Sequence, residues 1–261
     1  MALRSTWLRA LIVGAAIYAL VSVVAERTQN VHLLPAVLVL GALLIPVTFV
    51  VYVFERLSVD PAVLPTLAVC FWAGGSIGLA AAGFLEYETL RDLGTLPMLA
   101  VGVIEESVKV AVPLWLLVGG RFRQPGAGLL FGVASGMGFA ALETMGYGLV
   151  ALIQSHGQIG PTEQVLLLRG LLSPVGHAAW TGLVCAALWR RPLSWRLVAA
   201  AFATAVALHT LWDSTDSVIA RGAVGTLSGA LLAIQIRQAG LPRTAVTRLR
   251  GATPAVVRRT G

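Results

Sequence analysis

Eight long apolar stretches follow one another along this chain of 261 residues, and they restrict its fold more than any other feature. Each is long enough to cross a hydrocarbon core of about 30 Å as an α-helix. Hydrophobic residues make up 57% of the chain and charged residues only 12%. Because lipid offers the backbone no hydrogen bonds, such segments form helices rather than open sheets. The sequence therefore predicts an all-α polytopic bundle with spans at 8–25, 32–54, 63–84, 94–118, 126–151, 164–189, 195–215 and 218–236.

One integral membrane domain, residues 1–236, accounts for nearly the whole chain, and its polar motifs lie within 94–216. Arg4 and Arg9 precede the first span as in a signal peptide, but no small-residue cleavage site follows, so we expect a retained span. The tail at 237–261 has six arginines and no acidic residue. We expect it to be disordered and cytoplasmic, acting as a topology determinant or lying on anionic lipid.

The basic residues sort by loop, which predicts the orientation of the bundle. Fourteen arginines lie at the N-terminus, in the even-numbered loops and in the tail, against four in the opposite loops, which are Arg27, Arg91, Arg169 and Arg221. Cytoplasmic loops carry the excess of Lys and Arg, so both termini are predicted to be cytoplasmic. The same sorting argues that the net charge of +7 serves topology rather than nucleic-acid binding.

The only lysine of the chain, Lys109, lies inside the fourth span with Glu105 and Glu106. An ionisable side chain at the bilayer centre costs roughly 3 kcal/mol, so three of them indicate a functional site that faces the protein interior. Lys109 is four residues from Glu105 and three from Glu106, and can therefore reach either carboxylate along one helix face. One glutamate held in this way suits a general base acting on water. The alternative is a buried charge cluster that fixes helix packing.

The next three spans each add at least one polar side chain, and all of these lie at similar depths. Glu143 follows a ridge of small residues at Gly128, Gly132 and Gly136, which lets another helix approach closely. At 1.5 Å per residue, the expected depths agree within roughly 10 Å, which favours one convergent site. The side chains in question are Glu143 in the fifth span, His177 in the sixth, and His209 and Asp213 in the seventh.

Two histidines and a carboxylate match a hydrolytic zinc site in ligand type. His177 lies one turn after Pro174, whose freed backbone groups need polar partners or water. Asp213 lies four residues after His209, where it could orient the imidazole or act as a ligand. An HExxH motif is absent, so zinc is one possibility beside hydrogen-bonded packing histidines.

Taken together, these residues resemble the PrsW family of intramembrane proteases. The similarity rests on four motifs that occur in the family's order on consecutive spans: Glu105-Glu106-x-x-Lys109, Gly136-x-Gly138-Phe139-x-x-x-Glu143, His177 with Thr181-Gly182, and His209-x-x-x-Asp213. The wider group of CAAX prenyl proteases and abortive-infection proteins is distantly similar. It has Arg in place of Lys109 and His in place of Glu143, so prenylated substrates are not expected.

The resemblance implies hydrolysis of a peptide bond in a membrane-spanning protein, such as the first cut of an anti-sigma factor. It implies a catalytic set of Glu105, Glu106, Lys109 and Glu143, in which Glu105 or Glu106 activates water. His177 and His209, with Asp213, are the candidate metal ligands, or the histidines stabilise the oxyanion. The cofactor is then zinc, or the reaction is metal-free. We expect a multi-pass protein of a bacterial plasma membrane whose partner is a single-span substrate.

Two other functions fit the same residues. A proton-coupled transporter also places carboxylates and histidines inside the membrane, but would string them across it rather than cluster them. A non-catalytic partner of single-span proteins would use the polar groups only for packing, and Glu105→Gln and Glu106→Gln would then leave processing of its partner unchanged.

Overall fold

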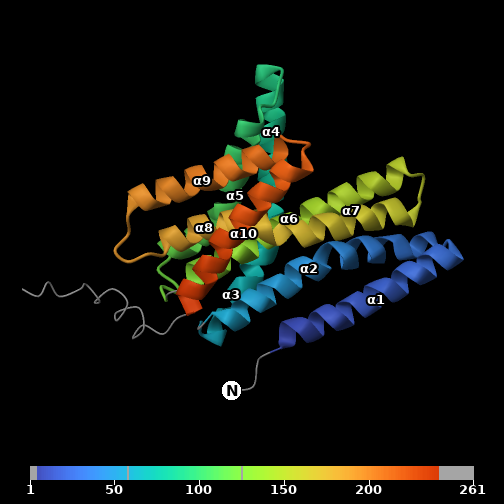
Figure 1. Cartoon of the computed structure of the whole chain (residues 1–261), viewed down its shortest axis with the longest axis horizontal. Coiled ribbons are helices and arrows are strands. Elements are labelled where there is room, and N and C mark those ends of the chain that lie inside the picture. The colour runs from blue at the N-terminus through green and yellow to red at the C-terminus, as the bar shows by residue number, and fades with distance from the viewer. Residues whose placement is uncertain (1–4, 58, 125, 241–261) are drawn as a thin grey trace, which may run out of the picture.

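The computed structural model describes residues 5–57, 59–124 and 126–240, and these are helical with short connections. The α-helices are α1 (Thr6–Thr28), α2 (Leu34–Arg56), α3 (Leu64–Val69), α4 (Gly75–Leu93), α5 (Met98–Val118), α6 (Ala127–Gln154), α7 (Ile159–Leu172), α8 (His177–Leu188), α9 (Trp195–Asp213) and α10 (Val218–Gly240). A π-helical turn, η3 (Cys70–Gly74), joins α3 to α4, and a 3₁₀ turn, η4 (Ser173–Val175), joins α7 to α8. Figure 1 shows the resulting bundle.

These elements form eight membrane-length segments, which confirms the predicted polytopic helical bundle. Seven of the segments found among the described residues are long and apolar enough to cross a membrane. The eighth, α5, is not among them, and it is the helix that carries Glu105, Glu106 and Lys109. The outward-facing side chains are largely apolar, as lipid contact requires, for example Ile12, Leu20, Phe84, Leu168 and Ile219.

Several predicted boundaries differ from the structure. The third segment continues to Leu93 rather than ending at 84, because the apolar residues before Glu86 continue the helical turn. The sixth begins at Ile159 rather than 164 and breaks at η4, where Pro174 interrupts the helix. The last helix reaches Gly240, so the predicted tail begins later than 237. The rest of that tail, 241–261, lies outside the described residues, so its expected disorder and lipid contact stay predictions.

Helix α6 lies at the centre of the bundle, and its first half is buried on every side. The predicted small-residue ridge faces α8. A β-carbon added to Gly132 would lie 2.6 Å from the Thr181 carbonyl oxygen, and one added to Gly136 would collide with the His177 carbonyl. The ridge therefore brings α8 into backbone contact with α6 and fixes where His177 and Thr181 lie.

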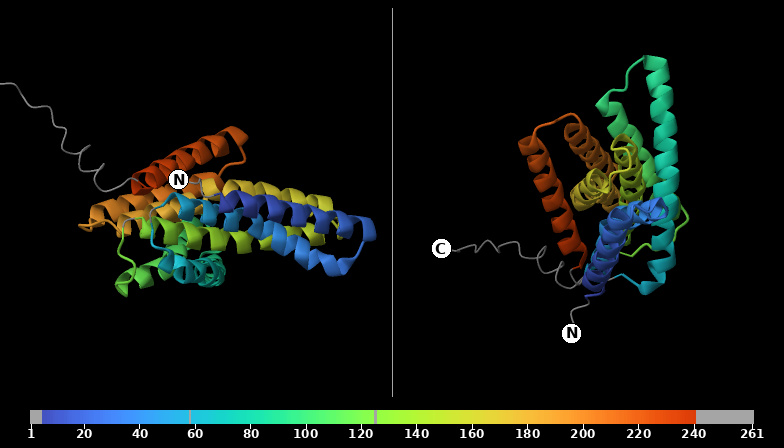
Figure 2. Two further views of the ribbon diagram at one scale, coloured as in Figure 1. Left: turned by 90° about the horizontal axis from the view of Figure 1, so that it is seen from below. Right: turned by 90° about the vertical axis from the view of Figure 1, so that its right-hand side faces the viewer.

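The long helix from α3 to α4 crosses α6 steeply, as the right-hand view of Figure 2 shows. This crossing is as close as the contact between α6 and α8, because Gly75 lies against the backbone of Gly138, and Gly138 lies against that of Phe71. Ser135 on α6 also donates to the Lys109 carbonyl oxygen at 2.6 Å, which ties α6 to α5. Close packing on three sides of α6 thus positions the charged segment of α5.

Both ends of the described chain lie at one end of the bundle, where α2 finishes. The backbone amide of Thr6 donates to Glu55 Oε1 at 3.0 Å. At the other terminus, Gly240 packs against the Arg56 carbonyl oxygen. This agrees with an even number of crossings; which side of the membrane that end faces remains a prediction.

Candidate active site

Lys109 lies at the centre of a polar cluster inside the bundle. Its ammonium donates to Glu105 Oε2 at 2.9 Å and to Glu106 Oε1 at 3.0 Å, and lies 2.9 Å from His177 Nδ1. The Phe139 ring covers it, with Nζ 4.4 Å from the ring centroid. An ammonium has three protons and no acceptor, so these three contacts use its full hydrogen-bonding capacity. They also require His177 Nδ1 to be the acceptor, which leaves the ring proton on Nε2.

Glu106 occupies the deepest position and is enclosed by protein. Besides Lys109, its carboxylate contacts His209 Nδ1 at 3.0 Å and accepts from Thr181 Oγ1 at 3.3 Å. A buried carboxylate is stable only when it is paired and hydrogen-bonded, and Glu106 meets both conditions. Since three helices supply its partners, Glu106 joins α5 to α8 and α9.

His209 links this buried centre to the partly exposed Asp213. Its Nε2 lies 3.0 Å from Asp213 Oδ2 and 3.6 Å from Glu105 Oε2. The indole of Trp180 stacks on the imidazole, with centroids 4.7 Å apart, and donates to Ser228 on α10 at 3.0 Å. Carboxylates at both ring nitrogens and the indole on one face therefore fix the orientation of the His209 ring.

A second branch of the cluster leads from His177 toward the surface. His177 Nε2 lies 3.2 Å from Glu143 Oε2, and Arg169 Nη2 lies 2.9 Å from the same oxygen. The Arg169 guanidinium stacks over the Tyr147 ring at 3.9 Å. The side chains of Glu143 and Arg169 are both partly exposed, so this branch extends from the buried centre to the surface of the bundle.

The two adjacent glutamates differ in access, which separates their roles. The Glu106 side chain is 0% exposed, whereas that of Glu105 is 10% exposed. Only one Glu105 oxygen, Oε2, is hydrogen-bonded within the described part of the chain. Lys109 contacts both carboxylates, so Glu105 Oε1 is the oxygen of the pair that is left without a hydrogen bond and on a partly exposed side chain.

The predicted metal ligands lie near one another but do not fit a metal centre as they are arranged. His177 Nε2 faces Glu143, while His209 Nε2 faces Asp213 and Glu105. Across residues 5–57, 59–124 and 126–240, no three histidine, cysteine, aspartate or glutamate side chains converge on one ion. The Lys109 ammonium already neutralises Glu105 Oε2, and it would repel a divalent cation placed on that oxygen.

The structure adds two site residues that sequence reasoning missed. Arg169 was counted only as an extracytoplasmic topology charge near the start of the sixth span, but it lies within α7 and pairs with Glu143. Glu86 lies on α4, which packs against α5, and its Oε1 is buried without a partner in the described residues. The signal for Arg169 was present, because apolar residues flank this cation on both sides.

The cluster thus unites all four predicted motifs in one place, with a slightly exposed carboxylate beside an ammonium and two imidazoles. Residues 61–237 match the model of the PrsW family intramembrane metalloproteases. The chain belongs to the PrsW family. Among curated proteins and solved structures, none matches it. The matched region of this PrsW protein begins after α2, and it contains every residue of the cluster.

Membership makes this chain a multi-pass membrane protein of a protease family. The family's description includes a metal, whereas the donors of this PrsW member are engaged with one another and with Lys109. The roles assigned to single residues remain predictions.

Proposed function

We propose that this PrsW protein hydrolyses a peptide bond of a membrane-spanning protein with water activated by Glu105. The observation that carries the proposal is the asymmetric pair on α5, in which Glu106 is sealed and Glu105 keeps one oxygen open. A transporter relay would string its charged groups across the membrane, whereas these groups contact one another in one cluster.

The proposed reaction uses Glu105 twice. Its free carboxylate oxygen takes a proton from water, and the hydroxide attacks the carbonyl carbon of the scissile bond. Glu105 then returns the proton to the leaving nitrogen as the C–N bond breaks. General acid–base catalysis of this kind contributes typically 10²–10⁴-fold.

Lys109 supplies positive charge for the oxyanion through space, since its three protons are already engaged, and the neutral His177 adds the dipole of its Nε2–H. His177 holds its proton on Nε2, on the side that faces Glu143 and the opening of the site. Arg169 lies on the same side and adds a positive charge there. Donors fixed before the reaction cost no reorganisation in the transition state. Glu106 and His209 position this machinery rather than touch the substrate.

The substrate we propose is a single-span membrane protein, with an anti-sigma factor as the first candidate. The family resemblance supports this choice, as does the depth of the polar residues in the outer half of the predicted spans. The charge bias supports cytoplasmic termini, and the family resemblance supports a bacterial plasma membrane.

Cleavage of a single-span substrate by the purified protein tests the proposal. We expect Glu105→Gln to lower kcat by at least about 10²-fold with the fold intact. The matched control is Glu26→Gln, an exposed glutamate of α1 that lies outside the cluster. Wild-type cleavage rates in Glu105→Gln would disprove Glu105 as the base.

Removal of metal tests the second half of the proposal. Exhaustive chelation should leave the rate of wild-type cleavage unchanged. Activity that disappears on chelation and returns with zinc, together with bound zinc that is lost in the double variant His177→Ala/His209→Ala, would show that these histidines hold a catalytic metal.

A further inference from the structure

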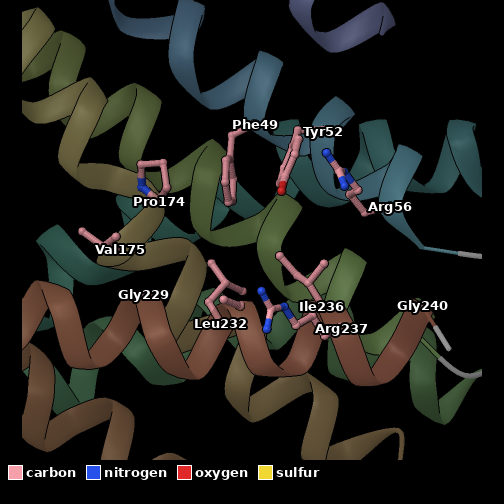
Figure 3. Close-up of a pocket in the computed structure, with 11 residues that line it drawn as sticks. Phe49, Tyr52, Arg56, Pro174, Val175, Gly229, Leu232, Ile236, Arg237 and Gly240 are labelled. Carbon is pink, nitrogen blue, oxygen red and sulfur yellow. The ribbon is translucent and has the colours of Figure 1, made fainter. Parts of the chain in front are cut away.

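An open groove lies between α2 and α10, on the side of the molecule away from α4. Its volume is about 740 Å³. Most of the side chains that line it are apolar, including Phe49, Pro174, Val175, Leu232 and Ile236. Figure 3 shows these side chains along the walls, with Pro174 and Val175 toward one end.

Two arginines, Arg56 and Arg237, lie toward the other end of the groove (Figure 3). Arg56 ends α2 and Arg237 is in the last turn of α10, so both belong to the end of the bundle where the described chain begins and finishes. Arg56 lies over the Tyr52 ring, with Cζ 5.0 Å from its centroid.

Neither arginine has an acidic partner within the described residues, although other arginines do. The neighbouring acid, Glu55, is directed to α1, where it accepts from the Thr6 amide. Both guanidinium groups are exposed and line the same apolar groove, and a planar guanidinium suits a phosphate oxygen pair.

The size and lining of the groove suit a small amphiphilic ligand. Its volume of about 740 Å³ falls in the ordinary range of small-ligand sites, and most of its lining is apolar. An acyl chain can follow such a groove along its length, while the charged group it carries stays at the mouth.

We propose that this groove binds an anionic phospholipid, with an acyl chain along the apolar walls and the phosphate between Arg56 and Arg237. Basic pockets between helices at a cytoplasmic membrane face bind lipid headgroups in this way. The α2 wall of the groove, with Arg56, precedes the region that matches the PrsW family, whereas the α10 wall up to Arg237 lies within that region.

The test is lipid binding to the full-length protein, delipidated in detergent and measured by native mass spectrometry and by thermal unfolding. Phosphatidylglycerol, phosphatidylcholine and inorganic phosphate are compared at equal concentration. We expect phosphatidylglycerol to bind and raise Tm, and the other two to do so at least tenfold more weakly. In Arg56→Gln/Arg237→Gln, phosphatidylglycerol affinity should fall at least tenfold.

The matched control is Arg190→Gln/Arg191→Gln, which removes two exposed arginines at the same end of the bundle but outside the groove. It should bind phosphatidylglycerol as the wild type does. A third variant, Ala233→Trp, leaves both guanidinium groups in place and fills the groove, so it should also lose the lipid. Ala233→Trp tests the groove if Arg56→Gln/Arg237→Gln does not fold.

Several results would overturn the proposal. Equal affinity for phosphatidylcholine would show that charge is not recognised, and equal binding of inorganic phosphate would show an anion site rather than a lipid site. Unchanged phosphatidylglycerol binding in Arg56→Gln/Arg237→Gln would place the lipid elsewhere. If Ala233→Trp raised KM for a single-span substrate and left lipid binding unchanged, the groove would belong to the substrate.

Discussion

Lys109 is the counter-ion of two carboxylates and donates to one imidazole, so its removal leaves the buried Glu106 carboxylate without its ammonium partner. Breaking a buried ion pair from one side costs about 3–5 kcal/mol. We therefore expect Lys109→Met to lower the free energy of unfolding by about that amount. Denaturant titration in micelles measures it. Adding Glu106→Gln to Lys109→Met should recover part of the loss.

The matched control for this prediction is Arg91→Met. Arg91 forms an exposed pair with Glu88, and exposed pairs contribute at most about 1 kcal/mol. Equal denaturation midpoints for Lys109→Met and the wild type would show that the buried cluster does not support the fold.

Arg169 acts on the reaction through Glu143, which in turn contacts His177. Its ion pair is partly exposed, so Arg169→Ala should change stability by less than about 1 kcal/mol. We expect kcat to fall about tenfold or more, because displacement of a catalytic group by 1 Å can cost about 10²-fold. Arg169→Lys should restore only part of kcat, since lysine can pair with Glu143 but cannot stack its charge flat on Tyr147.

Kinetics of substrate cleavage, with kcat and KM determined separately, decide the role of Arg169. Arg27→Ala provides the control, as this exposed arginine of α1 is remote from the cluster. If Arg169→Ala had a normal kcat and a raised KM, Arg169 would be a substrate-binding residue and not a residue that positions Glu143 and His177.

At the scale of elements, the contact between α6 and α8 determines where His177 and Thr181 meet α5. A β-carbon at Gly136 would overlap the His177 carbonyl, and there is no flexible side chain to yield. We expect Gly136→Val to abolish cleavage and to destabilise the fold by about 1–3 kcal/mol, as overpacked cores do. The control on the same helix is Gly146→Ala, where an added β-carbon meets nothing within 4 Å.

Cleavage and denaturation of the two glycine variants are measured side by side. Full activity in Gly136→Val would mean that α8 can move away from α6 without disturbing His177, contrary to the close packing described above.

The sequence was sufficient to predict the helices and their shared polar layer, because hydropathy and the cost of intramembrane charge are local properties. It was insufficient for contacts that depend on crossing geometry. The Arg169–Glu143 pair joins α7 to α6 and follows from no spacing along the chain. Glu86 was missed because the third span was ended before it. Similarly, which glutamate faces water depends on how α8 and α9 close over Glu106.

At the scale of the whole molecule, the charged residues of the cluster lie inside the bundle and apolar residues cover its outside. The carboxylates and Lys109 are enclosed by α4, α5, α6, α8 and α9, while the outer surface is largely apolar. Helices α1 and α2 lie outside the family match and contribute no residue of the cluster, but α2 forms one wall of the proposed lipid groove. Catalysis and lipid binding are thus assigned to different faces of the bundle.

Eight crossings with cytoplasmic termini predict which connections a membrane-impermeant thiol reagent reaches in intact cells. Cys70 and Cys185 are both buried, so the wild-type protein should give no background labelling. We expect Gln29→Cys, in the first connection, to be labelled from outside, and Arg190→Cys, in the sixth, only after the cells are opened. Both positions are exposed, so the two variants differ in side rather than in access. Labelling of Arg190→Cys in intact cells would show that the topology is the reverse of the predicted one. Glu143 and Arg169 would then lie toward the cytoplasmic side.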